Sequence, residues 1–252
     1  MPDAPVRYEV VGAVATITLD DPDRRNALST ALVDALFDGL QQAVGDDQVR
    51  VVVLTNSGTT FCAGADLTSG GLPAQHSLEE VLATILAAPK PVVGRIAGHC
   101  MGGGVGLAAV CDISVVVDVA KLGFTEVRLG LAPAIISVVC LPKLGLAHAH
   151  ELFLTGERIT AERAVAVGLC NRTASAADLD AAVAGYVEQL LAGGPLALAA
   201  IKDLIAVVPT LDTATAFAQM HQLSSALFAS EEGAEGMASF RERRAAAWVP
   251  RP

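Results

Sequence analysis

Short runs of apolar, mostly β-branched residues that alternate with helical patterns constrain the fold of this chain more than any other feature. Val49–Leu54 is such a run, bounded on both sides by residues that favour turns, which is typical of a buried strand. Pro91–Ile96 and Ile113–Val117 are similar runs, separated by a predicted short helix that ends near Val110. A helical pattern over Ser77–Ala87 precedes the second run. The repeated order of strand, loop and helix predicts an α/β fold.

The N-terminal segment predicts a β-hairpin followed by an amphipathic helix. Arg7–Val11 and Val14–Leu19 alternate in polarity and are divided at Gly12-Ala13, as expected for two antiparallel strands. Pro22 ends the second strand, and Ser29 provides a helix N-cap. Leucines recur on one face of this helix, at positions 28, 32, 36 and 40. The helix is therefore expected to pack on a sheet.

From Leu144 onward the pattern is almost wholly helical. Glycine and proline residues interrupt it, most clearly at Gly156, Gly168 and Gly193-Gly194-Pro195, and no strand-like run is longer than a few residues. The sequence thus predicts a β/α core over residues 1–192 and a helical part over residues 193–252, with no linker or charge block between them.

The composition excludes several classes of protein. Hydrophobic residues make up 52% of the chain and charged residues 17%, so a mainly disordered state is excluded. Lys and Arg total 17 against 27 Asp and Glu, and the net charge of -10 would repel nucleic acid and anionic membranes, so neither is expected as a partner. The longest apolar runs, Ile96–Cys111 and Leu129–Pro142, fall short of about 18 residues and contain glycine or proline. Because no secretory leader is recognisable at the start, a cytoplasmic location is expected.

Cysteines and histidines predict neither disulfides nor a metal site. The cysteines form no CxxC pair and lie in apolar surroundings, at positions 62, 100, 111, 140 and 170. They are expected to be reduced core thiols. Only His148 and His150 are close in sequence, and their spacing on a predicted helix points them to different faces. No metal is expected.

Two glycine-bearing segments, Phe61–Leu67 and His99–Gly106, are the strongest candidates for a functional site. Each follows a predicted buried strand as a loop that presents bare backbone. A helix beginning at the triple glycine would direct unpaired N–H groups and its positive dipole end at an anion. Tight turns that merely allow packing are the alternative. Gly104–Ala109 also fits a loose dinucleotide-binding pattern, but Asp118 follows too soon for the usual helix between them.

Further motifs occur in a consistent order, namely Asn26-Ala27-Leu28, Phe61–Leu67, Pro91–Asp112, Leu154-Thr155-Gly156 with Ala161–Leu169, and Glu231–Phe240. Through them nearly the whole chain resembles the crotonase superfamily, the enoyl-CoA hydratase/isomerase family. The resemblance implies an α/β crotonase (ClpP/crotonase-like) fold, in which repeated ββα units form the core and the C-terminal helical part mediates trimerisation. It also implies a homotrimer or a dimer of trimers, an acyl-CoA thioester as substrate and no permanently bound cofactor.

The resemblance assigns chemistry to three positions. The thioester oxygen would lie between the backbone N–H groups of Ala65 and Gly103, which would stabilise an enolate; ordinary turn residues are the alternative. Glu126 would act as the acid/base, with its pKa raised by apolar surroundings; a solvated carboxylate paired with Arg128 is the alternative. The family's other glutamate falls on Gly106, which has no titratable group.

A lone glutamate favours isomerisation of a 3-enoyl to a 2-enoyl thioester, because hydration must also position water at C3. The combination of Gly102–Leu107, Thr125–Leu131 and Pro133–Ser137 nevertheless resembles bacterial hydratases for branched or carboxylated enoyl-CoA, such as the methylglutaconyl type. The missing side chain at Gly106 would then leave room for a bulky acyl group. A catalytically silent acyl-CoA-binding protein is a third alternative.

An acidic protein must gather positive charge to hold the phosphates of CoA. The resemblance points to Arg24 and Arg243 for this role, whereas Arg25 and Arg244 are as well explained by solvation. It places further residues against the substrate or its CoA part, namely Ala27, Leu28, Ala63, Asp66, Gly102 and Phe240. Phe240 and Arg243 would reach a neighbouring subunit's ligand. Asp66 and Asp112 are expected to act structurally at loop ends.

Overall fold

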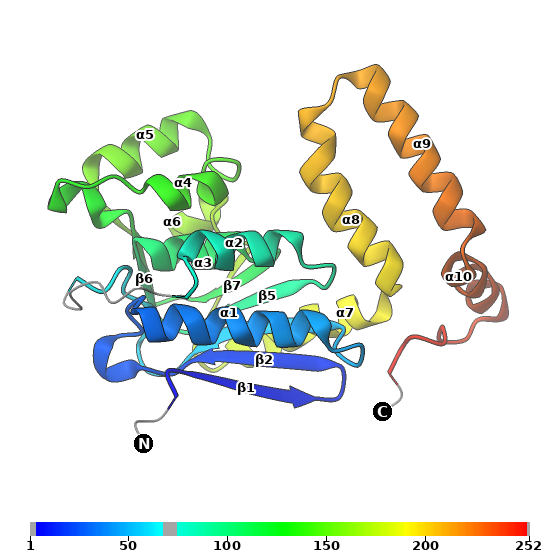
Figure 1. Ribbon diagram of the computed structural model, residues 1–252, viewed down its shortest axis with the longest axis horizontal. Coiled ribbons are helices and arrows are strands. Elements are labelled where there is room, and N and C mark those ends of the chain that lie inside the picture. Colours follow the sequence, from blue (N-terminus) through cyan, green and yellow to red (C-terminus); the bar gives the residue numbers. More distant parts are fainter. Residues whose placement is uncertain (1–3, 68–74, 251–252) are drawn as a thin grey trace.

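The computed structural model describes residues 4–67 and 75–250, which form a two-sheet core and a helical C-terminal part (Figure 1). The larger sheet has the strand order β1-β2-β3-β5-β7-β10 and the smaller the order β4-β6-β8-β9. The strands of the larger sheet are β1 (Val6–Val11), β2 (Val14–Leu19), β3 (Val51–Asn56), β5 (Val92–Ile96), β7 (Ile113–Val117) and β10 (Arg172–Ala174). Those of the smaller sheet are β4 (Thr60–Cys62), β6 (His99–Met101), β8 (Lys121–Gly123) and β9 (Arg158–Thr160).

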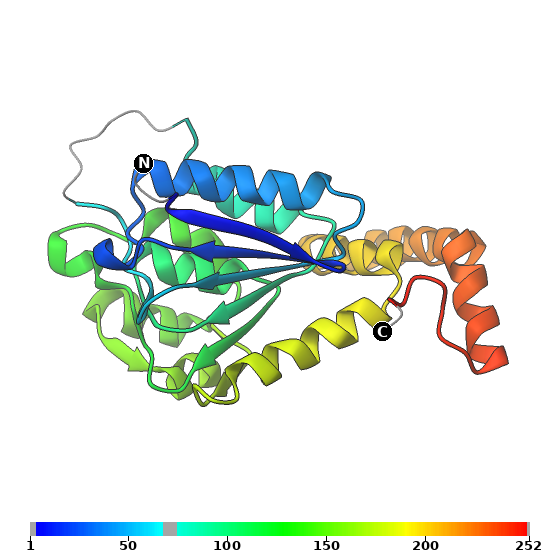
Figure 2. The ribbon, with the colours of Figure 1, turned by 90° about the horizontal axis from the view of Figure 1, so that it is seen from below.

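Helices cover both faces of the larger sheet. α1 (Thr30–Gly45) packs on β1 and β2, and α7 (Leu179–Ala192) contacts β3, β5 and β7 from the opposite side (Figure 2). Every residue of β3 is buried between these layers. The remaining core helices are α2 (Leu78–Ala87), α3 (Gly103–Val110), α4 (Ala134–Cys140), α5 (Leu146–Thr155) and α6 (Ala161–Ala166).

The predicted hairpin and first helix are confirmed. β1 and β2 pair antiparallel around Gly12, whose φ of 58° lies in the left-handed region that glycine tolerates. The Oγ of Ser29 accepts a hydrogen bond from the Leu32 N–H at 3.3 Å and caps α1. The leucines at positions 32, 36 and 40 are buried beneath this helix. Ser77 caps α2 in the same way and forms a reciprocal capping box with Glu80.

Repeated ββα units build the core. In β3-β4-α2, β5-β6-α3 and β7-β8-α4, a longer strand of the large sheet is followed by a short strand of the small sheet and then a helix. The predicted strand Val49–Leu54 starts two residues too early, since β3 covers Val51–Asn56.

The prediction of loops after these strands was wrong in part. Residues 61–62 and 99–101, which the sequence places in the two glycine-bearing loops, belong to the strands β4 and β6. Three residues are too few to show an alternating pattern, and their partners are distant in sequence. Glu126 lies in a 3-10 helix, η2 (Thr125–Leu129).

The cysteines are buried thiols, as predicted. All five lie in described residues, and each is buried and outside any disulfide. Burial raises the pKa of the thiols of Cys62, Cys111, Cys140 and Cys170 to about 12. These groups are therefore protonated at neutral pH and are poor nucleophiles.

The C-terminal helices extend away from the core (Figure 1). They are α8 (Pro195–Val207), α9 (Thr213–Ala229) and α10 (Glu231–Glu242), with a short 3-10 helix η3 (Val208–Thr210) between the first two. Every residue of α8 and α9 is at least partly exposed. The apolar side chains that they present to solvent include Ile205, Phe217 and Phe228, each at least 65% exposed.

Polar contacts fix these helices to the core near Gly193. The Arg50 guanidinium donates hydrogen bonds to the carbonyl oxygens of Trp248 at 2.8 Å and Gly193 at 2.7 Å. The Trp248 indole donates to the Ala192 carbonyl at 3.0 Å. On α8, the Nζ of Lys202 lies 2.7 Å from Asp112 Oδ2.

Replacing Arg50 by Ala is expected to loosen the C-terminal helices without unfolding the sheet. The variant loses two charge-assisted hydrogen bonds across the junction. Each is worth about 1.5 kcal/mol, which corresponds to about a tenfold change in the equilibrium for detachment of the C-terminal helices from the core. Amide hydrogen exchange over residues 195–248 should therefore accelerate at least about tenfold, while β3, β5 and β7 stay protected. Arg7→Ala, which removes a largely exposed ion pair with Asp20, is the control. Unchanged exchange in α8–α10 would contradict this role.

Candidate active site

A cleft of about 330 Å³ lies where the chain leaves β4, enters α3 and passes from η2 into α4. Its lining is almost entirely apolar. Among the described lining residues, Thr125 and Glu126 carry the only polar side chains. The residues that line it are Leu28, Ala63, Gly64, Ala65, Leu67, Leu78, Gly102, Gly103, Thr125, Glu126, Leu129, Leu131, Ala132, Pro133, Ala134, Ile135 and Ile136.

The two predicted glycine segments meet in this cleft. The N–H of Leu28 donates to the Gly64 carbonyl at 2.8 Å, which fixes the first segment, and Ala65 forms a β-bridge with Leu28. A methyl group at Gly64 would lie 2.9 Å from the Met101 carbonyl oxygen and 3.5 Å from the Gly103 nitrogen. With a φ of 89° as well, position 64 requires glycine. The absence of a side chain therefore brings the two backbones together.

Two residues of the cleft lining, Ala65 and Gly103, have backbone N–H groups without an acceptor among the described residues. Gly103 is the first residue of α3, so its N–H has no acceptor within the helix. Within residues 4–67 and 75–250, neither this N–H nor that of Ala65 donates a hydrogen bond. The positive end of the α3 dipole adds to their attraction for negative charge. This arrangement can bind an oxyanion.

Glu126 enters the same cleft from η2. Its Oε2 atom is buried and has no hydrogen-bond partner in the described part of the chain. Its Oε1 atom lies 3.0 Å from the position that a methyl group on Gly102 would occupy. Burial raises the pKa of Glu126 above the usual value for a glutamate. The alternative pairing with Arg128 is not among the ion pairs of the described residues, so no basic side chain there holds this carboxyl group in an ion pair.

Position 106 contradicts one expectation from the sequence. Gly106 is buried in α3, and a methyl group placed there would overlap Ile136 of α4, whose Cβ would lie only 2.8 Å away. The missing side chain therefore does not leave room for a bulky acyl group. Ile136 fills that space instead. The sequence could not show this, because the two residues become neighbours only in the folded protein.

The residues predicted to hold CoA divide into two groups. Leu28, Ala63 and Gly102 line the cleft, and Ala27 and Asp66 adjoin these lining residues in the sequence. By contrast, Phe240 and Arg243 lie on or just after α10, at the end of the molecule remote from the cleft (Figures 1 and 2). Phe240 is 86% exposed.

The arginines differ in their surroundings. Arg24 is exposed in a 3-10 helix, η1 (Pro22–Arg24), and pairs with Asp21 at 2.8 Å. Arg244 forms ion pairs with Glu235 and Glu242, both at 2.6 Å, which agrees with the solvated alternative. Asp112 is structural, as expected, because Oδ2 accepts hydrogen bonds from Val92 N–H and Lys202.

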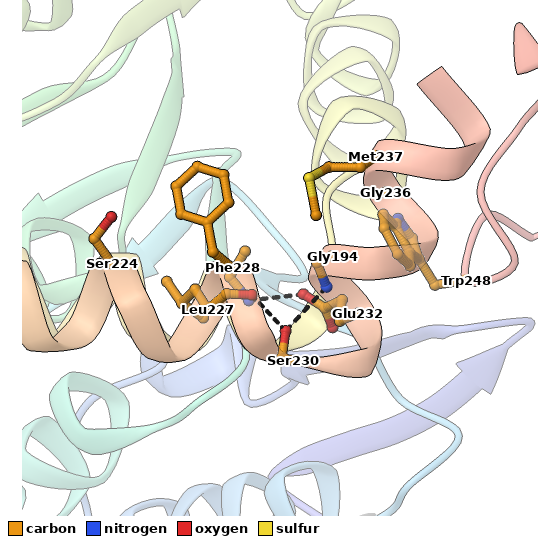
Figure 3. A pocket seen from close by; sticks show the side chains of 11 residues that line it. Gly194, Ser224, Leu227, Phe228, Ser230, Glu232, Gly236, Met237 and Trp248 are labelled. Atoms are coloured by element: carbon orange, nitrogen blue, oxygen red, sulfur yellow. Dashed lines mark hydrogen bonds between the residues drawn. The ribbon is translucent and has the colours of Figure 1, made fainter. Parts of the chain in front are cut away.

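Another cavity, of about 370 Å³, lies between the end of α9, the start of α10 and Trp248. Phe228, Met237 and Trp248 surround it (Figure 3). Its one acidic side chain among the described lining residues is Glu232, whose two oxygens accept hydrogen bonds from the N–H groups of Leu196 and Ala197. Because this carboxylate already caps α8, the cavity is a poorer candidate for proton transfer than the cleft at Glu126.

The sequence profile of the enoyl-CoA hydratase/isomerase family matches residues 9–251. The chain belongs to this family. Enoyl-CoA hydratase domain-containing protein 2, mitochondrial, of Bos taurus is 34% identical over 248 residues, covering 92% of this chain and 82% of that protein. (E)-Benzylidenesuccinyl-CoA hydratase of Thauera aromatica is 30% identical over 252 residues, covering 97% and 98%. The crystal structure of an enoyl-CoA hydratase from Mycobacterium smegmatis superposes with a TM-score of 0.90 at 29% identity, covering 98% and 99%.

The comparisons confirm the crotonase fold predicted from the sequence motifs. The protein is an enzyme of the enoyl-CoA hydratase/isomerase family that acts on acyl-CoA. Sequence reasoning did not identify the apolar wall of the cleft, to which Leu78, Leu129, Leu131 and Ile136 belong. Its one signal was the similarity of Thr125–Leu131 and Pro133–Ser137 to certain hydratases.

No single helix in the described residues is long and apolar enough to span a membrane, although α7 and Pro195–Thr210, bent by 107°, pass together on length and composition. In the same ranges no three His, Cys, Asp or Glu side chains gather closely enough to hold a metal ion.

Proposed function

We propose that this enzyme stabilises a thioester enolate between the N–H groups of Ala65 and Gly103 and moves protons with Glu126 alone. One observation carries the proposal: a buried carboxylate oxygen without a hydrogen-bond partner lies in the same cleft as two free N–H groups. Negative charge that develops on the thioester oxygen would be stabilised by donors already in place.

Double-bond isomerisation is the reaction that these groups support best. The Glu126 carboxylate removes a proton from C2 of a 3-enoyl thioester, and the electron pair spreads onto the thioester oxygen and C4. The protonated carboxyl group then returns the proton at C4, which leaves a 2-enoyl thioester. Each step needs one acid/base and one oxyanion site, and no water molecule takes part.

Hydration of a branched or carboxylated enoyl-CoA is the second candidate function. The relative from Thauera aromatica supports it, because its name describes a hydratase for an acyl group derived from succinate. In such a reaction Glu126 would need a second group to hold the water. A carboxylate of the substrate itself is one group that could do this.

Incubation with a panel of thioesters separates these candidates. Straight-chain 3-enoyl-CoA, straight-chain 2-enoyl-CoA and a carboxylated 2-enoyl-CoA are the substrates, and products are identified by mass and retention. We expect isomerisation of the 3-enoyl substrate to exceed hydration of the 2-enoyl substrate by about a hundredfold, since one acid/base group is missing. Rapid hydration without any double-bond shift would contradict the isomerase proposal, and hydration of the carboxylated substrate alone would favour the second candidate.

Assembly as a homotrimer or a dimer of trimers is part of the proposal. The exposed apolar side chains of α8 and α9 support it, as does the distance of Phe240 and Arg243 from the cleft of their own chain. In such an assembly the C-terminal helices of one subunit would complete the CoA site of another. The cytoplasmic location expected from the sequence remains a proposal.

Replacing Arg24 or Arg243 by Ala is expected to weaken CoA thioesters by about 1 to 3 kcal/mol each, if each loses a charge-assisted contact with phosphate. The salt dependence of binding should become shallower. Titration calorimetry at two ionic strengths measures both effects, with Arg172→Ala, an exposed arginine on β10, as the control. Unchanged affinity in both variants would mean that other groups hold the nucleotide.

A further inference from the structure

Three glycines at the start of α3 each allow a different neighbour to approach closely. A methyl group at Gly103 would lie 2.5 Å from Leu28 Cδ1, one at Gly104 would overlap the backbone of Cys62, and one at Gly106 would overlap Ile136. Gly103 lies in the cleft, whereas Gly106 lies one turn further along the helix and does not line it. At position 106 the space for a side chain is therefore taken by another residue.

Ile136 occupies this space from α4. Its side chain is 3% exposed and lines the cleft. α3 and α4 pack closely against each other, and Gly106 is where Ile136 enters the contact. Any side chain at 106 and the isoleucine at 136 exclude each other sterically, so the two positions form one packing unit.

We infer that Ile136 is a specificity-determining residue that selects an unbranched hydrocarbon acyl chain. By excluding a side chain at position 106, it also leaves Glu126 as the single carboxylate of the site. The inference rests on the proposed function, from which the direction of the bound acyl chain is taken. With the thioester oxygen at Ala65 and Gly103, the chain runs on between Glu126 and the wall formed by α4.

The chemistry of this wall supports a hydrocarbon ligand. The described lining holds no lysine, arginine or histidine that would neutralise a second carboxylate. A carboxylated acyl chain would meet apolar side chains and the like charge of Glu126, which costs binding free energy. A branch on the chain would meet the isoleucine side chain.

Binding of saturated acyl-CoAs tests this inference independently of turnover, because these thioesters have no double bond to move or hydrate. Butanoyl-CoA and 3-methylbutanoyl-CoA are compared by calorimetry for the parent enzyme, Ile136→Ala and Ile136→Val. We expect Ile136→Ala to shift the affinity ratio toward the branched ligand by at least about tenfold and Ile136→Val by about threefold, because the first removes three side-chain carbons and the second removes one. Free CoA should bind all three proteins equally. Val138→Ala, 69% exposed on the same helix, is the control and should leave the ratio unchanged.

A double variant tests the steric coupling. Gly106→Glu alone should lower the melting temperature, and Ile136→Ala should recover at least about half of that loss when the two are combined. An unchanged ligand ratio in both Ile136 variants, or equal destabilisation by Gly106→Glu with and without Ile136, would overturn the inference. If the parent enzyme turns over no enoyl thioester, the proposed function fails, yet these binding and stability results still decide the role of Ile136.

Discussion

Glu126→Gln is expected to lose at least about a hundredfold in turnover, while its affinity for acyl-CoA stays within about twofold of the parent. The amide keeps the shape of the side chain but cannot carry a proton at neutral pH. Steady-state kinetics with a 3-enoyl-CoA and calorimetry with a saturated acyl-CoA measure the two quantities separately. Glu157→Gln, which changes an exposed glutamate outside the cleft lining, is the matched control and should keep full activity.

The pH dependence gives an independent check on Glu126. The group must be ionised to remove a proton, so kcat/KM should fall at low pH. Because burial raises the pKa of Glu126 above the ordinary value of 4.5, this fall should occur at a higher pH than for an exposed glutamate. A parent enzyme whose kcat/KM falls only near the ordinary value would contradict a buried base.

The same pKa shift predicts the effect on stability. A carboxyl group with a folded-state pKa above its unfolded value binds more protons when folded, so the free energy of unfolding falls as pH rises between the two values. At neutral pH the ionised Glu126 therefore destabilises the fold. Glu126→Gln should be at least as stable as the parent in denaturant titrations at pH 7. A clear loss of stability there would mean that the carboxylate is held by favourable interactions.

Local signals in the sequence were sufficient for much of the fold. The hairpin around Gly12, the Ser29 cap and the buried strands β3, β5 and β7 depend on residues within a few positions of one another. Short strands were missed because β4, β6 and β8 have three residues each and pair with partners far along the chain. A segment of this length has no pattern of alternation that would distinguish a strand from a loop.

Of the site, only the residues that belong to recognisable motifs could be predicted from the sequence. The glycine segments were identified from their own sequence and Glu126 through the resemblance, but neither shows that the Glu126 carboxylate lies against Gly102. Ile136 and Gly106 are 30 positions apart, and their contact depends on how α3 packs on α4. The same holds for Arg50 and Trp248, which are separated by 198 residues. Contacts of this kind leave no periodic signal.

Gly103→Pro is expected to lower turnover by about 10²- to 10³-fold beyond the effect of Gly103→Ala, because it removes one of the two N–H groups proposed for the oxyanion. Proline is tolerated at the first position of a helix, where the N–H has no helical acceptor. The alanine variant keeps the N–H but adds the same Cβ, which would lie 2.5 Å from Leu28 Cδ1 and 3.3 Å from Leu78 Cδ2.

Comparison of the two variants therefore separates the hydrogen bond from the steric effect. The neighbours of the added Cβ, Leu28 Cδ1 and Leu78 Cδ2, are ends of side chains that can rotate. Each variant should therefore retain the fold, which circular dichroism and thermal unfolding verify. Steady-state kinetics then give the difference in activation free energy between Pro and Ala at one position. If the two folded variants turn over 3-enoyl-CoA equally, the Gly103 N–H does not stabilise the enolate, and the oxyanion must be held by Ala65 with another donor. If only the proline variant loses activity, the negative charge develops at the start of α3, where the helix dipole also favours it.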